Sequence, residues 1–473
     1  MHRARYAALA AAALVVVVAC NGTAATTAPT AAPVVTTAPV VTTAPVVTTA
    51  PVVTTAPVVT TAPVTPEASA PVATSTPIPP PTADCASAAP TSPAPAGIPT
   101  GLTGTLSVWE AYGASGAAER DAFCTMVANV TAANPGLTVS VLDYPFGNLF
   151  STFELQAASG GGPDLYIAPN DSLTTEARAN LLEDVTTMGD TLKAAPYNIS
   201  DTAITADTVD GKLYAFPESM KAVATFYRTD IFPTAPATTA DWLKPANAPK
   251  LGLVYGANGG GAYYQWGLYG AFGGTILASD GKCSATATTG VADSLKFLQD
   301  FKAAGGHLYQ NDGDAKTDFE SGAIGAFIDG PWQSGDLKTA LADKLAVAPG
   351  PSGTGGPFSP LAAPDGYYVN ASSANQDLAG KFALAMLTPT NEQIFVDQAG
   401  HIPATTTIKI SDPIAAGFQT AISTGFARPT AKELNNYWGN FGDAIAKAVD
   451  AGTDPTTLVS DACTKMDQAN AGS

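Results

Sequence analysis

The stretch FSTFELQAASGGGPDLYIAPND, residues 150–171, decides the fold class. It begins with apolar residues at helical spacing, breaks at consecutive glycines, and continues as a strand-like apolar run over residues 164–167. Upstream, the sequence predicts a strand over 105–112, an amphipathic helix through Ala133, and a second strand within 134–144. Strands that alternate with helices predict a parallel, doubly wound α/β sheet.

The N-terminal segment is typical of an exported protein that stays at the membrane. Arg3 and Arg5 precede an apolar run, which is the pattern of an export signal over residues 1–19. The run spans about a dozen residues, fewer than the roughly 20 of a membrane-spanning helix. Residues 17–20, VVAC, resemble the signal of bacterial lipoproteins, which predicts lipid attachment at Cys20; an ordinary export signal followed by a chance cysteine is the alternative. We therefore expect an extracytoplasmic protein, lipid-anchored to the cell membrane on its outer face or in the periplasm.

A repetitive segment follows the predicted lipid anchor. Residues 31–64 repeat APVVTT with a period of six, and Pro and Thr then dominate to about Pro99. Regularly spaced prolines interrupt helices and remove the N–H donors of a sheet, so they favour an extended chain. The sequence predicts a Thr/Pro/Ala/Val-rich disordered linker over residues 20–102.

Charge excludes two classes of partner. The chain carries 22 basic and 40 acidic residues, and removal of residues 1–19 leaves 20 basic residues against the same 40. A surface this acidic repels nucleic acid and anionic lipid. We expect no nucleic-acid partner, and contact with the membrane only through the lipid anchor.

The remaining cysteines fit an exported protein. An even number of cysteines outside the cytosol predicts two disulfides among Cys85, Cys124, Cys283 and Cys463, with three possible connectivities. None of the four lies within a few residues of another or of a histidine, which argues against a zinc cluster. No metal and no cofactor are expected.

Five segments downstream of the linker resemble the maltose-binding type of extracellular solute-binding protein, which serves ABC sugar importers. They occur in the order of that family, and the resemblance covers about residues 103–470. The segments are GGGPDLYIAPND (160–171), DGKLYAFPESMKAVATFYRTDIF (210–232), DFESGAIGAFIDGPW (318–332), AGHIPATT (399–406) and ELNNYWGNFGDAI (433–445).

The resemblance implies a two-lobed α/β fold of the periplasmic-binding-protein type. Lobe one would comprise 103–218 and 362–410, and lobe two 219–361 and 411–473. A hinge between the lobes would close around a ligand in the cleft that separates them. The chain would be a monomer that binds a sugar or oligosaccharide, such as a maltodextrin-like glycan, and delivers it to the transmembrane subunits of an ABC importer.

The lobe boundaries implied by the resemblance also favour one disulfide connectivity. Cys283 and Cys463 both fall in lobe two, while Cys85 lies just upstream of the lobe that contains Cys124. We therefore predict the bonds Cys283–Cys463 and Cys85–Cys124.

A sugar site needs aromatic rings against the C–H faces of the sugar and carboxylates or amides at the hydroxyls. Trp332 follows Gly330-Pro331 at the end of a buried-type strand, where open α/β sheets bind ligands, and matches a stacking position of the family. A wedge that covers the strand end is the alternative.

Two further aromatic residues match stacking positions of the family. Trp438 is one, although Tyr437 and Phe441 at helical spacing also indicate a core stripe. Tyr263 is the other. It lies in a predicted helix with several aromatic residues, so the alignment with the family leaves the matching position open by one residue.

Polar candidates come from the same resemblance. Asp171 matches a carboxylate that binds sugar hydroxyls, and a helix N-cap is the alternative reading of this residue. The family's crossover glutamate is replaced here by Lys221, with Glu218 three residues earlier. A charged pair in the first turn is also missing, and Glu110 or Tyr112 would take its place.

Other classes of function are less well supported. A lipid-anchored glycan-acting enzyme would need two carboxylates about 5–10 Å apart, for which Asp365 is one of several candidates, and a surface adhesin would account for the long stalk. The chain has no Gly-x-Ser-x-Gly, Walker or Gly-x-Gly-x-x-Gly motif. The acidic stretch NDGDAKTD (311–318) lacks the glycine at the sixth loop position and the terminal glutamate of an EF-hand loop, and is better explained as a helix start. We expect a binding protein and not an enzyme.

Overall fold

The structure is a computed structural model that describes residues 82–114, 116–256 and 260–472. The chain divides into two units, Met1–Thr74 and Ser75–Ser473, and only the second contains described residues. The predicted export signal, Cys20 and the APVVTT repeat lie outside the described residues. Within them, no helix is both long and apolar enough to cross a membrane.

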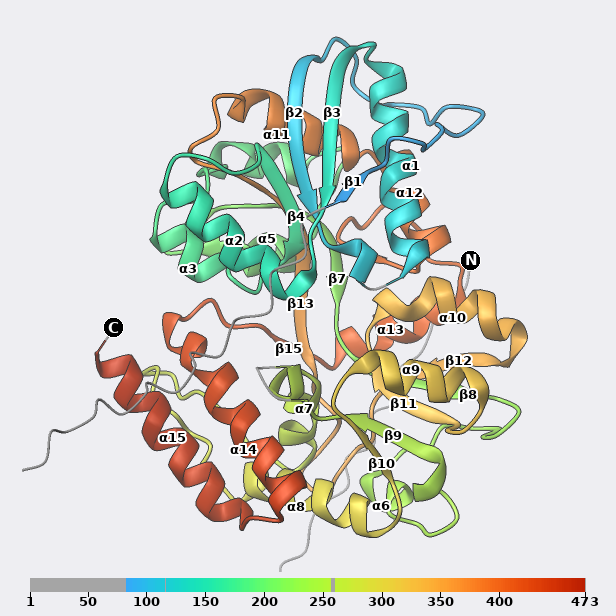
Figure 1. Ribbon diagram of the computed structural model, residues 1–473, viewed down its shortest axis with the longest axis vertical. Coiled ribbons are helices and arrows are strands. Elements are labelled where there is room, and N and C mark those ends of the chain that lie inside the picture. Colours follow the sequence, from blue (N-terminus) through green and yellow to red (C-terminus); the bar gives the residue numbers. More distant parts are fainter. Residues whose placement is uncertain (1–81, 115, 257–259, 473) are drawn as a thin grey trace, which may run out of the picture. The chain divides into compact units, whose positions relative to one another are not determined.

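Among the described residues, one sheet of eight strands forms the first half of the fold (Figure 1). Its strand order is β1-β3-β2-β4-β13-β7-β14, and β15 pairs with β13. Strands β2, β3 and β4 are parallel, whereas β13 runs antiparallel to β4 and β7. The strands are β1 Thr82–Asp84, β2 Thr103–Glu110, β3 Gly136–Asp143, β4 Leu165–Pro169, β7 Phe216–Lys221, β13 Leu361–Val369, β14 Ile402–Pro403 and β15 Phe426–Ala427.

Helices cover both faces of this sheet, and we call the resulting body lobe one. Alternate residues of a strand point to opposite faces, so Val108 of β2 packs in the cluster that holds Phe123 and Phe382, while Trp109 packs in the cluster that holds Phe153. The helices of lobe one are α1 Ala117–Ala133, α2 Phe146–Ala158, α3 Leu173–Arg178, α4 Gly189–Lys193, α5 Asp201–Ala206, α11 Gln376–Met386 and α12 Pro389–Ile394. A small β5–β6 pair, Thr208–Val209 and Lys212–Leu213, lies between α5 and β7 in sequence.

A second sheet of five strands forms lobe two in the described part of the chain, in the order β10-β9-β11-β8-β12. Its strands are β8 Ala224–Arg228, β9 Leu251–Val254, β10 His307–Tyr309, β11 Ala326–Asp329 and β12 Leu345–Ala348. Here too the two faces are covered, since Ile328 packs with Phe441 while Phe327 packs with Phe418. The helices are α6 Thr239–Trp242, α7 Gly260–Ala271, α8 Gly290–Ala303, α9 Asp312–Ser321, α10 Ser334–Leu341, α13 Pro413–Ser423, α14 Tyr437–Ala451 and α15 Pro455–Ala471.

Two strands of the first sheet lead directly into lobe two. β7 ends at Lys221, and β8 of the second sheet begins at Ala224. β13 begins at Leu361, which packs in the core of lobe two, and ends beside β4, where Val369 pairs with Leu165. Figure 1 shows β7 and β13 running between the two sheets. The predicted two-lobed α/β architecture is therefore what the structure has.

The end of the predicted linker differs from expectation, because residues from 82 onward pack on lobe one. β1 pairs antiparallel with β3, and Cys85 is bonded to Cys124 of α1. A second disulfide joins Cys283 to Cys463 in lobe two. Both bonds have the expected pairing. The short β1 was missed because its partner strand lies more than fifty residues downstream and TAD carries no strand pattern of its own.

The acidic stretch 311–318 is a helix start, as expected. The Asn311 side chain accepts a hydrogen bond from the backbone N–H of Asp314 at 2.8 Å, which caps α9. Acidic side chains in the first turn also interact favourably with the positive end of the helix dipole. Capping therefore accounts for these closely spaced acids.

Candidate functional site

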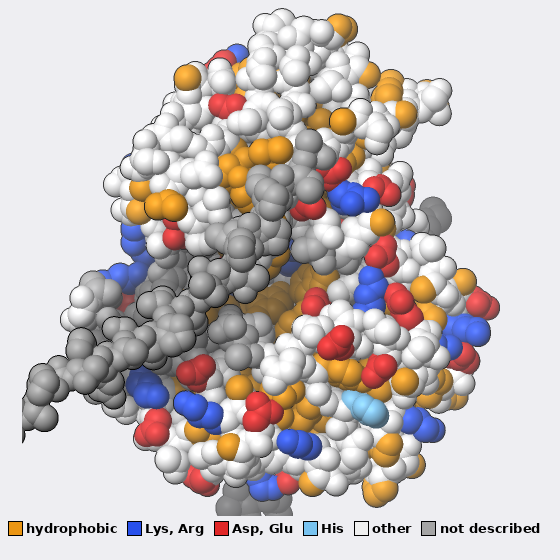
Figure 2. Space-filling view, viewed as in Figure 1, with side chains coloured by type: hydrophobic (Ala, Val, Ile, Leu, Met, Phe, Trp, Pro, Cys, Tyr) orange, Lys and Arg blue, Asp and Glu red, His pale blue; other side chains and the backbone are white. Residues whose placement is uncertain are grey.

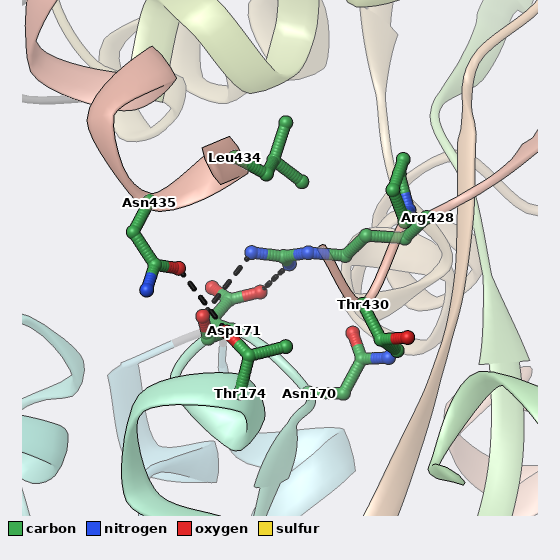
Figure 3. A pocket seen from close by; sticks show the side chains of 8 residues that line it. Asn170, Asp171, Thr174, Arg428, Thr430, Leu434 and Asn435 are labelled. Carbon is green, nitrogen blue, oxygen red and sulfur yellow. Dashed lines mark hydrogen bonds and ion pairs between the residues drawn. The ribbon is translucent and has the colours of Figure 1, made fainter. Parts of the chain in front are cut away.

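A pocket opens between the two lobes, and its wall joins the loop after β4 to the segment that precedes α14 (Figure 3). Asn170, Asp171 and Thr174 belong to lobe one, while Arg428 and Asn435 belong to lobe two. The residues come from sequence positions more than 250 apart. The fold alone brings them together.

Asp171 and Trp438, both expected in the site, are connected through Arg428. The Arg428 guanidinium forms an ion pair with Asp171 and also donates to the Asp171 backbone carbonyl at 3.3 Å. Its Cζ lies 4.6 Å from the centroid of the Trp438 ring, a cation–π arrangement. Asp171 does not cap α3, because the N-cap of that helix is Ser172. The helix N-cap alternative for Asp171 is therefore wrong, and its role in binding sugar hydroxyls stays a prediction.

The lobes touch directly on two sides. On one side Asn435 accepts from Thr174 at 3.2 Å and donates to Thr175 at 2.9 Å. On the other, Asp336 of α10 accepts from the backbone N–H of Ala118 in the first turn of α1, at 3.2 Å. Gly116 permits this contact, since a Cβ there would lie 2.1 Å from the Asp336 carboxylate. The lobes are thus held close together in this structure.

Trp332 lies in a short 3₁₀ helix, Pro331–Gln333, directly after β11. Its ring covers Gly330, where an added Cβ would lie 2.0 Å from a ring carbon. The ring centroid is 6.2 Å from that of Tyr263 and 6.5 Å from that of Tyr264. Lys221 approaches the same ring, with Nζ at 5.4 Å from the centroid. The absence of a side chain at Gly330 therefore leaves the space that the Trp332 ring occupies.

Burial separates the tryptophans of the chain into two groups. Trp109, Trp242 and Trp266 are buried, at 4%, 0% and 7% exposure. Trp332 and Trp438 are partly exposed and pack with one side against the core of lobe two. Figure 2 shows hydrophobic side chains in the hollow between the lobes. An exposed ring anchored from behind is what a stacking platform requires.

The alternative reading of Trp438 applies to its neighbours instead. Tyr437 and Phe441 are fully buried and their rings lie 5.0 Å apart. These two residues form the core stripe of α14. Trp438 lies one position away from that stripe, on a less buried side of the helix.

Tyr263 lies near charged groups from both lobes. Burial raises the pKa of its hydroxyl, and the carboxylates of Asp171, Asp365 and Asp329 raise it further, against the effect of Arg428. The phenol is therefore neutral and can both donate and accept a hydrogen bond. Four of the expected residues, Trp332, Tyr263, Trp438 and Asp171, thus converge on one region.

Of the two residues expected to replace the family's charged pair, Tyr112 lines a pocket and Glu110 does not. Tyr112 lines a second pocket, beside Lys221 and Asp365. Glu110 is fully buried and accepts a hydrogen bond from the Tyr112 backbone N–H. Burial and the neighbouring Asp143 raise the pKa of Glu110 to about 8. The structure places Glu110 behind Tyr112, where it holds the turn.

Glu218 lies in a buried network and does not line either pocket described above. His401 donates towards Glu218 through Nδ1 at 3.1 Å and contacts Glu119 through Nε2 at 2.7 Å. Burial by itself lowers the pKa of His401, but Glu218 and Glu119 outweigh it and raise the pKa to about 10. The imidazole also stacks on Phe395, with centroids 4.3 Å apart. His401 is therefore a structural cation between two carboxylates.

We expect the free energy of unfolding to fall as the pH rises from about 7 to about 10. His401 has a pKa of about 10 when folded and 6.5 as a free side chain, so the folded protein binds its proton more tightly. That stabilisation is complete below pH 6.5 and is lost as the pH approaches 10. The buried acids Glu110 and Glu176, whose pKa values burial raises to about 8, act in the same direction between pH 4.5 and 8.

Chemical denaturation at several pH values measures this dependence, and His401→Gln isolates the histidine. The variant should be less stable at pH 6 and should lose less stability between pH 8 and 10 than the wild type. If the free energy of unfolding of the two proteins changed equally with pH, the role given to His401 would be contradicted.

Sequence reasoning missed three charged residues of the site. Arg428 was not predicted, Lys221 stood out only as a departure from the family, and Asp365 only as a possible enzyme carboxylate. Lys221 forms an ion pair with Asp365 on neighbouring crossing strands. A lone carboxylate in the apolar run LAAPDGYYV was the available signal, because an unpaired charge in a buried strand is costly. Arg428 had no comparable local signal.

A metal centre finds no support within the described residues. The one group of potential ligands found there joins Asp84 to Cys85 and Cys124. Those two sulfurs form a disulfide and carry no thiolate. This group therefore offers no thiolate to a metal ion.

Two α/β lobes joined by crossing strands, with a polar pocket between them and partly exposed aromatic rings nearby, define a protein that binds a small solute by enclosing it. The model of the bacterial extracellular solute-binding protein family matches residues 125–420. The chain belongs to this family. Its members are binding proteins, and the expectation that the chain is not an enzyme is confirmed on that ground.

Individual relatives agree with this assignment. A galactooligosaccharide-binding protein of Bacillus subtilis is 24% identical over 340 residues, which covers 67% of this chain and 79% of the relative. A maltodextrin-binding protein of the same organism is 21% identical, with 69% and 82% covered. Among solved structures, a maltotriose-binding protein of Thermus thermophilus with bound maltotriose is 25% identical at a TM-score of 0.69, covering 77% of this chain and 99% of that one. The predicted fold class is confirmed.

Proposed function

We propose that the protein captures an oligosaccharide of the maltodextrin or galactooligosaccharide type and delivers it to an ABC importer. The observation that carries this proposal is the set of partly exposed aromatic rings, Trp332, Tyr263 and Trp438, beside carboxylates and amides where the lobes meet. Aromatic rings match the C–H faces of sugars, and the polar groups match hydroxyls. Relatives named for maltodextrin, galactooligosaccharide and maltotriose binding support the same ligand class.

In the proposed function, the two lobes close around the bound oligosaccharide. The contacts that join the lobes, Arg428–Asp171, Asn435–Thr174 and Asp336–Ala118, would form or tighten as a ligand bridges the cleft. A ligand stabilises the closed state only by the difference between its affinities for the two states. The importer would then recognise the closed, loaded form.

A thermal-shift screen tests the ligand class. The melting temperature should rise with maltose- or galactose-based oligosaccharides, because a ligand that binds only the native state stabilises it by RT ln(1 + [L]/Kd). Amino acids and short peptides serve as controls and should leave it unchanged. A rise with peptides alone would contradict the proposed ligand class.

We further propose that Cys20 carries the lipid that holds the protein at the membrane. The VVAC sequence at 17–20 supports this, as does a maltooligosaccharide-binding relative from Streptococcus pneumoniae that is named a lipoprotein, at 22% identity. Cys20→Ser should move the protein from the membrane fraction to the soluble fraction. Fractionation and immunoblotting measure this, and unchanged membrane retention would contradict the anchor.

A further inference from the structure

A second pocket lies on the wall of lobe one, at the ends of its central strands. Its lining combines Tyr112, which follows β2, with Ala168 of β4, Lys221 of β7 and Asp365 of β13. Phe146, the first residue of α2, completes the lining. Of these residues, only Tyr112 was among those expected to bind ligand.

The polar atoms on this wall have unused hydrogen-bonding capacity. Asp365 is fully buried, and Oδ1 has no hydrogen-bond partner among the described residues, while Oδ2 is in ion-pair contact with Lys221. The buried hydroxyl of Tyr112 likewise lacks a hydrogen-bond partner in the described part of the chain. Buried polar atoms are paired in roughly 90% or more of cases. A group that fills the pocket would supply the missing partners.

The charges on this wall suit a hydroxyl better than a free anion or cation. Burial favours the neutral amine of Lys221, but Asp365, Glu119 and Asp171 outweigh it and raise the pKa of Lys221. Burial raises the pKa of Asp365 to about 6, against the effect of Lys221, so the two residues are an oppositely charged pair at neutral pH. A sugar hydroxyl can donate to Asp365 and accept from Lys221 or Tyr112, using both members of the pair at once.

Phe146 adds an apolar surface at the same pocket. It is 42% exposed, one of three large hydrophobic residues that are this exposed in the described chain. Its ring meets Phe150 edge-on at 5.7 Å, which holds it from one side. Ala168 lies on the same wall and is too small to stack on a ring. An exposed aromatic at the edge of a pocket is suited to contact with a ligand.

We propose that Phe146, Tyr112 and the Lys221–Asp365 pair form a ligand subsite on lobe one, in which Phe146 stacks on a sugar ring and Asp365 and Lys221 bind its hydroxyls. This subsite rests on the proposed oligosaccharide ligand. It faces a ligand that Trp332 and Tyr263 hold from lobe two, since Lys221 lies against Trp332. An oligosaccharide would then contact an aromatic ring from each lobe.

Phe146→Ala tests the stacking part of the subsite, with Leu155→Ala as its matched control. Leu155 lies on the same helix, is 75% exposed, and lines neither pocket described above. Calorimetric titration with the oligosaccharide that binds wild type most tightly should show at least fivefold weaker binding for Phe146→Ala and no change for Leu155→Ala. Both variants should melt close to wild type, because both side chains are exposed.

Asp365→Asn and Lys221→Met test the polar part. Each should weaken binding at least tenfold, and the loss should be smaller for a monodeoxy sugar that lacks the hydroxyl concerned. A merely structural ion pair would instead lower the apo melting temperature and leave the affinity of the folded protein unchanged.

The outcomes separate the subsite from the wider proposal. Wild-type affinity in Phe146→Ala, Asp365→Asn and Lys221→Met, together with lost binding in Trp332→Ala, would overturn the subsite and keep the sugar-binding function. Wild-type protein that binds no oligosaccharide would overturn both. Weaker binding in all three variants, with Leu155→Ala unchanged, would support the subsite.

Discussion

Trp332→Ala should weaken oligosaccharide binding by about 2 kcal/mol or more, which is about thirtyfold in Kd. The ring is partly exposed, lies 6.2 Å from Tyr263, and stands at the end of β11 beside the crossing strand β7. Its exposed face is available to a sugar, while its other side packs on the core of lobe two. Truncation should therefore remove binding energy and only part of the packing energy.

A buried tryptophan provides the contrast. Trp242 is fully buried, and its indole N–H donates to the Pro236 carbonyl at 3.0 Å. Trp242→Ala should lower the free energy of unfolding by about 3–5 kcal/mol and leave the affinity of the folded fraction unchanged. Calorimetric titration and chemical denaturation of both variants measure the two effects. A large loss of stability with unchanged affinity in Trp332→Ala would make Trp332 a core wedge.

Removing the Cys283–Cys463 disulfide should cost about 2–5 kcal/mol of unfolding free energy. The bond closes a loop with a sequence separation of 180 and joins the region after α7 to α15. It therefore restricts the unfolded chain strongly. The second bond, Cys85–Cys124, has a separation of only 39.

The difference between the two loops gives a sharper test. In the chain-entropy account, the longer loop contributes about 1.4 kcal/mol more than the shorter one. The double variants Cys283→Ala/Cys463→Ala and Cys85→Ala/Cys124→Ala are matched in chemistry and differ in the loop they open. Denaturant unfolding of both should rank the long-loop variant as the less stable. The reverse order would show that local packing, and not loop length, determines the contribution of each bond.

Much of the fold was readable from local patterns. The helix–glycine–strand sequence at 150–171 appears as α2 and β4, and the strands and helix before it as β2, α1 and β3. Helix α2 begins at Phe146, earlier than its apolar spacing indicated, because Pro145 takes the N-cap position. Local periodicity defines such elements because each forms largely from its own residues.

The site was only partly predictable, for a physical reason. Trp332 could be placed at a strand end because Gly330-Pro331 precedes it. The pairs Arg428–Asp171 and Lys221–Asp365 join distant segments, so neither partner shows in the sequence near the other. Glu218 was expected near the ligand, and only the fold shows that its carboxylate is hydrogen-bonded to His401. Long-range ion pairs of this kind need the three-dimensional structure.

Isothermal titration calorimetry with maltose- and galactose-based oligosaccharides of increasing length tests the central claim most directly. The account predicts saturable one-to-one binding of at least one series by the wild-type protein. It also predicts strongly reduced heat for the same ligand in Trp332→Ala. A correctly folded wild-type protein that gives no binding heat with either series at millimolar concentration would contradict the account.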